Sequence, residues 1–200
     1  MNTQKTLGLL TVAMDFVGER SCPPSGRMGH LKADLWSVPG YDNFEPDTPG
    51  INAESEVVLF AFAVAMLLKP KLIVETGSYC GLTARALGYA AISNGNGCEV
   101  YTCDVDPKAI FATQQICPGS VTVVSAPASQ LHDKISQCDL LFSDSSYESR
   151  IEEIRWLKPG AIGILHDTGM EDHLDREIRS LYPGSVFIPT PRGLTMFQKE

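Results

Sequence analysis

The sequence has few of the features that mark membrane, disulfide-rich or nucleic-acid-binding proteins. Its longest apolar run, Val57–Leu68, is too short to cross a bilayer. Lys and Arg number 16 against 24 Asp and Glu, and the net charge of −8 argues against nucleic acid or an anionic membrane as the main partner. None of the 6 cysteines forms a CxxC pair and no secretory signal is evident, so we expect reduced thiols in a cytoplasmic protein.

The length of 200 residues suits one domain, preceded by an irregular extension. Residues 1–50 are weakly patterned and rich in proline and glycine, which predicts a short helix followed by a long loop. Such a loop could close over a site as a substrate lid. The patterned domain therefore spans residues 51–200.

Within residues 51–200, short apolar runs alternate with helical segments. The predicted strands are Leu72–Glu75, Val100–Cys103, Val121–Val124, Leu140–Phe142, Ala161–Leu165, Val186–Pro189 and Leu194–Gln198. Predicted helices separate them, except before the last strand, where a short turn forces antiparallel pairing. We therefore expect an α/β fold: a doubly wound, mostly parallel seven-stranded sheet with an antiparallel C-terminal strand. Such a sheet binds ligands at the C-terminal strand ends, where the strand order reverses.

The first motif with chemical content follows the first strand, where Glu75 precedes Gly77 and Gly81 in an acidic-x-G-x-x-x-G pattern. Glycines permit a tight turn and close approach of a ligand to the backbone, and the next helix offers free N–H groups. A dinucleotide site would show G-x-G-x-x-G, which is absent. Glu75 would repel a diphosphate but suits a cationic sulfonium and amine. The alternative interpretation is an ordinary glycine-rich turn.

The second motif is Asp104, which ends the second strand. A carboxylate at this position can accept two hydrogen bonds from a ribose diol. Its alternative role, capping the next helix, is better filled by Asp106 ahead of Pro107. Together the two motifs indicate a nucleoside-type cofactor.

At this point the sequence resembles the catechol O-methyltransferase group of class I S-adenosylmethionine (SAM)-dependent methyltransferases. The similarity covers residues from about 51 to the C-terminus and is most specific in the loop after the first strand. The segments that carry it are 51–56, 72–83, 121–130, 139–144 and 158–167. The resemblance implies SAM as the cofactor, with a small-molecule substrate.

Carried over by position, the resemblance implies a complete set of cofactor-binding residues. The methionine side would be lined by Glu75, Gly77 and Tyr79, with Thr83 near the carboxylate, Gly81 in the same loop, Asp104 at the ribose, and Ser125 and Ala126 at the adenine.

The resemblance also implies a Mg²⁺ ion between Asp144 and Asp167, carboxylates that end the fourth and fifth strands. The sequence departs from the family pattern at two points: Thr168 replaces the usual Asn ligand, and Tyr147 replaces the catalytic Lys. Two close carboxylates without a cation would instead share a proton. The catalytic candidates are Asp144, Tyr147 and His166, and a structural role is the alternative for the tyrosine and the histidine.

The predicted function is SAM-dependent O-methylation of a small hydroxylated acceptor, such as a catechol, a sugar or a secondary metabolite. Two alternatives remain: a SAM-binding domain without activity in a larger assembly, and a nucleotide-sugar or NAD-binding enzyme. Nucleic acid and membranes are not expected partners, and the sequence is compatible with a homo-oligomer.

Overall fold

The computed structural model describes residues 53, 55–169, 172–190 and 192–200. The predicted extension 1–50 and its lid lie outside these residues. Among the described helices, none combines the length and the apolar character that crossing a bilayer would need.

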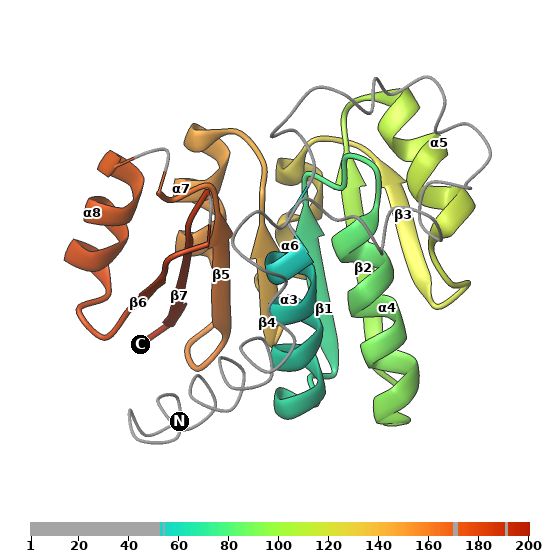
Figure 1. Cartoon of the computed structure of the whole chain (residues 1–200), viewed down its shortest axis with the longest axis horizontal. Coiled ribbons are helices and arrows are strands. Elements are labelled where there is room, and N and C mark those ends of the chain that lie inside the picture. The colour runs from blue at the N-terminus through green and yellow to red at the C-terminus, as the bar shows by residue number, and fades with distance from the viewer. Residues whose placement is uncertain (1–52, 54, 170–171, 191) are drawn as a thin grey trace.

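Seven strands form one mixed sheet at the centre of the molecule, in the order β3-β2-β1-β4-β5-β7-β6 (Figure 1). The strands are β1 (Leu72–Thr76), β2 (Glu99–Asp104), β3 (Val121–Ser125), β4 (Leu140–Ser143), β5 (Ile162–His166), β6 (Val186–Ile188) and β7 (Leu194–Gln198). The first five are parallel, and β7 runs antiparallel to both β5 and β6. The predicted fold is confirmed, including the antiparallel C-terminal strand.

The strand order reverses between β1 and β4, which are neighbours at the middle of the sheet. From β1 the chain proceeds outward through β2 and β3, and from β4 it proceeds outward through β5 on the other side. The loops after β1 and β4 therefore separate at this point and leave room for a ligand between them.

Helices cover both faces of the sheet (Figure 1). Apolar side chains of α3 (Ser55–Leu68) and α4 (Leu82–Asn94) share one core cluster with the sheet, and α5 (Pro107–Ile116) packs beside α4. The opposite cluster contains residues of the short helix pair η2 (Ala128–Leu131) and α6 (His132–Ile135), and of α7 (Tyr147–Trp156) and α8 (Asp172–Leu181).

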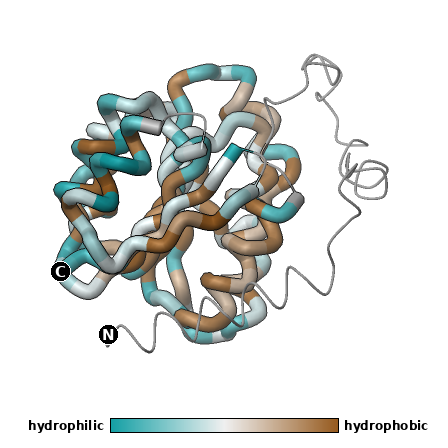
Figure 2. The backbone as a smooth tube through the Cα atoms, turned by 60° about the vertical axis from the view of Figure 1, so that its left-hand side comes forward, coloured by the Kyte–Doolittle hydropathy of each residue, from teal (hydrophilic) through white to brown (hydrophobic). Residues whose placement is uncertain are grey.

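The parallel strands are apolar because both of their faces are buried. Ile73 of β1 packs toward α3 and α4, whereas its neighbour Val74 packs in the cluster of α6, α7 and α8. The hydropathy tube shows the same pattern, with hydrophobic colour concentrated along the central strands (Figure 2). This burial explains why the strands appear in the sequence as continuous apolar runs.

Local sequence signals set the ends of two helices. The Asp106 side chain accepts a hydrogen bond of 2.9 Å from the Lys108 N–H, which confirms its predicted role as the cap of α5. Helix α4 ends at Gly95 in the left-handed conformation.

Candidate functional site

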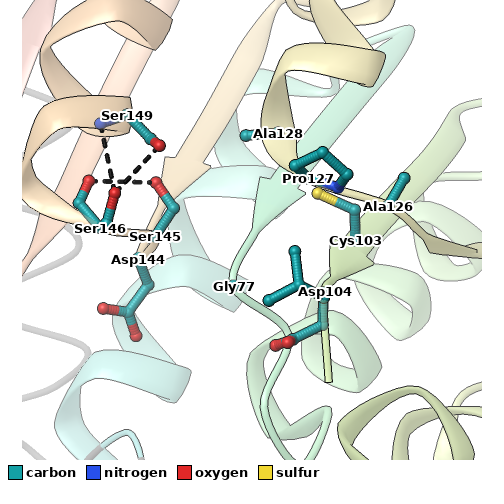
Figure 3. Close-up of a pocket in the computed structure, with 11 residues that line it drawn as sticks. Gly77, Cys103, Asp104, Ala126, Pro127, Ala128, Asp144, Ser145, Ser146 and Ser149 are labelled. Carbon is teal, nitrogen blue, oxygen red and sulfur yellow. Dashed lines mark hydrogen bonds between the residues drawn. The ribbon is translucent and has the colours of Figure 1, made fainter. Parts of the chain in front are cut away.

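A pocket of about 300 Å³ opens at the C-terminal ends of β1 to β4. It is lined by Gly77, Cys103, Asp104, Val105, Ala126, Pro127, Ala128, Asp144, Ser145, Ser146 and Ser149. Figure 3 shows Asp144 and Asp104 on either side of Gly77, with the segment from Ala126 to Ala128 above them. The pocket thus lies at the reversal of strand order, as the sequence predicted for a ligand site, and has a carboxylate at each end.

Asp104 is fixed at the rim of this pocket by two backbone N–H groups. Tyr79 donates to its Oδ2 and Asp106 to its Oδ1, each at 2.9 Å. A carboxylate oxygen has more than one lone pair, so both oxygens can still accept from a ligand diol. The sequence prediction of Asp104 as a diol-binding residue is consistent with this geometry and stays a prediction.

The loop after β1 passes close to two other backbone segments. Gly77 and Gly81 both have φ of 79°, the left-handed region that glycine adopts without strain. A Cβ on Gly77 would overlap the backbone carbonyl of Asp144, and one on Gly81 would lie 2.8 Å from Thr113 Cα. Glycine is therefore required at 77 because of the contact with the loop after β4. This requirement adds to the close approach of a ligand that the sequence predicted there.

Glu75 is buried at the end of β1, with 1% of its surface exposed, and the Thr102 hydroxyl of β2 donates to its Oε2. Burial raises the pKa of Glu75 to about 8, against the lowering effect of the Thr102 bond, and the nearby Asp144 and Asp104 raise it further. Glu75 is not among the residues that line the pocket. Its predicted contact with a cofactor stays a prediction.

The other predicted cofactor residues surround the same strand ends. Tyr79 is partly buried with φ of 43°, and Thr83 is buried in the first turn of α4. Ser125 ends β3 opposite Asp104 and is exposed, whereas Ala126 is buried and lines the pocket. The structure therefore brings the residues predicted for the methionine side of the cofactor and those predicted for its ribose and adenine to one edge of the sheet.

The predicted catalytic and metal residues form a cluster at the ends of β4 and β5. His166 lies between two carboxylates: its Nδ1 is 2.9 Å from Asp144 Oδ2, and its Nε2 is 3.3 Å from Asp167 Oδ1. The His166 side chain is fully buried, while the two carboxylates are about one-fifth exposed (21% and 19%). Burial raises the pKa of Asp167, and Asp144 raises it too, whereas the neighbours His166, Arg192 and Arg150 lower it.

Two arginines that the sequence analysis did not select complete this cluster. Arg150 of α7 places Nη2 3.3 Å from Asp144 Oδ1 and donates through Nη1 to the His166 carbonyl at 2.8 Å. Arg192, just before β7, places Nη1 3.3 Å from Asp167 Oδ2. The sequence contains a signal for Arg192. When the last strand pairs antiparallel with the fifth strand, the start of the last strand lies beside Asp167, which follows the fifth strand.

Mg²⁺ between Asp144 and Asp167 fits the distances but not the charges. Ligand atoms of Asp144, His166 and Asp167 all lie within 4.8 Å of one another. Thr168, which stands where the family has its Asn ligand, is buried, and its hydroxyl accepts a 2.9 Å hydrogen bond from Thr195. At an effective dielectric constant of 20, two unit charges 4 Å apart interact by about 4 kcal/mol, and a divalent ion doubles the repulsion from each guanidinium. The residues present do not fit this ion.

Tyr147 begins α7 and contacts α8. Its hydroxyl donates to Glu177 at 2.9 Å, and its ring packs against His173 with centroids 4.5 Å apart. Tyr147 is not among the residues that line the pocket. These contacts agree with the structural alternative for Tyr147, and its catalytic role remains untested.

Glu153 is a buried acidic residue that the sequence analysis also did not select. Its carboxylate, on α7, accepts hydrogen bonds from the hydroxyls of Thr76 (2.7 Å), Ser143 (2.6 Å) and Ser145 (2.6 Å). These hydroxyls lie at the end of β1, at the end of β4 and in the pocket wall, so Glu153 ties together the elements that frame the pocket. Only Ser145 of this group is itself part of the lining.

A family model described as "Methyltransferase domain" matches residues 74–168. The match begins in β1 and ends just after Asp167, so it contains every lining residue of the pocket. Residues 74–168 are therefore similar to a methyltransferase domain. The prediction of such a domain is confirmed.

Solved structures share the fold of this methyltransferase domain over nearly the whole chain. A Podospora anserina methyltransferase bound to S-adenosylhomocysteine (SAH) is 16% identical, with a TM-score of 0.66, covering 100% of this chain and 97% of that one. An O-methyltransferase from Bacillus cereus in complex with SAH is 14% identical, with a TM-score of 0.67 and coverage of 95% and 97%.

A third structure is the Streptomyces achromogenes O-methyltransferase involved in tomaymycin synthesis, in complex with SAM. It is 13% identical, with a TM-score of 0.66 and coverage of 95% of this chain and 96% of that one. No curated protein sequence matches the chain. The shared fold is the one in which these solved proteins hold SAM or SAH.

Proposed function

We propose that this chain is a SAM-dependent O-methyltransferase that acts on a small hydroxylated acceptor, such as a catechol, a sugar or a secondary metabolite. The observation that carries the proposal is the pocket with Asp104 at one end and Asp144 at the other, on either side of Gly77. One carboxylate suits the ribose of a nucleoside donor, and the other suits the hydroxyl of an acceptor.

The donor end suits a nucleoside chemically. Val105, Ala126, Pro127 and Ala128 offer an apolar wall for a purine, while Asp104 offers acceptor oxygens for a ribose diol. On this proposal, Tyr79 and Thr83 lie toward the methionine end, and Glu75 lies just before the same loop, at the end of β1. When bound, SAM supplies an activated methyl group, which passes to the acceptor oxygen as the carbon–sulfur bond breaks and SAH leaves.

The acceptor end contains the group that takes the hydroxyl proton. Asp144 is partly exposed at the pocket wall, and it is oriented by His166 and Arg150 on its two oxygens. A carboxylate fixed in this way acts as a general base while the acceptor oxygen attacks, and most of the remaining rate comes from holding the reactants in line.

Three further lines support the finer parts of the proposal. Two of the similar solved proteins are described as O-methyltransferases, which favours oxygen as the methyl acceptor. The net charge of −8 favours a small molecule over nucleic acid. The described cysteines are all free thiols, in keeping with a cytoplasmic protein.

Ligand-induced stabilisation followed by a transfer assay tests the proposal. SAM and SAH should both raise the melting temperature, and NAD should not, because only a ligand that binds the folded state stabilises it. Transfer of a labelled methyl group from SAM to one member of a panel of phenols, catechols and sugars should follow. Stabilisation by NAD alone would overturn the proposal, and SAM binding without transfer to any acceptor would favour the inactive assembly component.

Asp144→Asn separates chemistry from donor binding. The amide keeps the size and one acceptor oxygen but cannot take a proton, so we expect kcat to fall by about 10²–10⁴-fold, the usual contribution of general base catalysis. SAM affinity, measured by calorimetry, should stay within a few-fold of wild type. A variant that retains full turnover would remove Asp144 from the reaction.

A further inference from the structure

Two guanidinium groups and one imidazole surround the carboxylate pair at the ends of β4 and β5. Asp144 has Arg150 on Oδ1 and His166 on Oδ2, and Asp167 has Arg192 next to both of its oxygens. We propose that Arg150 and Arg192 take the place of a divalent metal at this site, so that the acceptor is bound and methylated without a metal ion.

Arg150 is built into the framework of the site. Its side chain is 6% exposed, and its Nε donates to the Ser145 carbonyl at 2.6 Å while Nη1 donates to the His166 carbonyl at 2.8 Å. One guanidinium therefore joins the loop after β4 to the end of β5 and still contacts Asp144. Its charge is a fixed part of the acceptor end of the pocket.

Arg192 is held at the same place by backbone pairing. Its carbonyl accepts from the Gly169 N–H at 2.8 Å, and the neighbouring Gly193 carbonyl accepts from the Thr168 N–H at 3.3 Å. The side chain is 14% exposed and lies against Asp167, with Nε 3.2 Å from Oδ1. Its Nη2 is 3.5 Å from His166 Nδ1, so the charge of Arg192 reaches the centre of the cluster.

Arginines in place of a metal ion change what the site requires of the acceptor. This consequence rests on the proposed function. A metal ion orients an acceptor by binding two adjacent oxygens, whereas guanidinium groups form hydrogen bonds without chelation. The site therefore requires one hydroxyl and no vicinal diol. A phenol and the matching catechol should be methylated with kcat/KM values within a few-fold of each other.

The test measures Mn²⁺ binding to the full chain by electron paramagnetic resonance. Four proteins are compared: wild type, Arg192→Gln, Arg192→Lys and Arg155→Gln. Wild type and Arg192→Lys should bind no Mn²⁺ specifically, because both keep the positive charge. Arg192→Gln should bind Mn²⁺ at least about tenfold more tightly than wild type, as loss of that charge exposes the carboxylates. Arg155→Gln makes the same change of net charge at a side chain that is 62% exposed on α7, and should behave as wild type.

Methyl transfer by wild type should also continue at full rate in EDTA. The proposal is overturned if wild type binds one Mn²⁺ ion and loses activity in EDTA, or if Arg192→Gln binds Mn²⁺ no better than Arg155→Gln. If Arg192→Gln does not fold, the wild-type measurements decide alone. A chain that transfers no methyl group defeats the proposed function, while the Mn²⁺ measurements still decide what replaces the metal.

Discussion

Glu75 is a carboxyl group whose ionisation the surrounding protein opposes. Its pKa of about 8 in the folded chain lies well above the ordinary value of 4.5, mainly because the side chain is buried. The folded state therefore holds a proton that the unfolded chain has lost between these two pH values. Stability contributed by this group is complete below pH 4.5 and falls as pH rises toward 8.

Glu75→Gln should remove this dependence. The amide can still accept from the Thr102 hydroxyl and has no charge to bury, so the variant should gain up to about 1.4 kcal/mol over wild type for each pH unit within the window. Thermal or urea unfolding at pH 5, 7 and 9 measures the difference. An equal offset at all three values would show that Glu75 is ionised in the folded protein.

Single residues explain what the sequence could and could not predict about the site. Glu75, Gly77 and Asp104 could be found because they stand at strand ends, and strand ends follow from the apolar pattern. Arg150 and Glu153 could not, because charged residues on a helix ordinarily belong to a solvated face. Both are buried here because α7 places them against hydroxyl and carbonyl groups of the loops beneath.

Among the elements, β1 and β4 meet at a junction where two loops are in close backbone contact. At this junction the chain after β1 turns at Gly77, where no Cβ fits because the backbone of Asp144 occupies the space. The Asp144 N–H also donates to the Thr76 carbonyl at 2.9 Å, which holds the two strand ends together.

Gly77→Ala should therefore cost much more than the same change at a glycine with open space around it. Gly95 is the matched control, because its φ is also positive (59°) and nothing lies within 4 Å of its Cβ position. Gly95→Ala should cost about 1 kcal/mol of unfolding free energy, the strain of a left-handed alanine, whereas Gly77→Ala should cost at least 2 kcal/mol more, roughly the scale of overpacking. Chemical denaturation measures both, and equal losses would contradict the close contact.

At the scale of the whole molecule, the fold could be predicted almost completely from the sequence. Parallel strands buried on both faces appear as continuous apolar runs, and the missing helix before the last strand specifies antiparallel pairing. Of the charges at the ends of β4 and β5, Arg192 follows from the pairing of β7 with β5, but Arg150 could not be predicted, because its place depends on how α7 packs against the loops beneath it. These charges come together only once the sheet has formed.

Titration of SAM by calorimetry into wild type, Asp104→Ala and Asp106→Ala tests the central claim most directly. The two aspartates are close neighbours, but Asp104 faces the pocket, whereas the Asp106 side chain caps α5. Wild type should bind SAM, and Asp104→Ala should lose roughly 1.5–3 kcal/mol of binding free energy, the value of hydrogen bonds to a charged group. Asp106→Ala should lose about 1 kcal/mol of stability and keep its affinity. A folded Asp104→Ala protein with unchanged affinity, or a wild type that binds no SAM, would contradict the account.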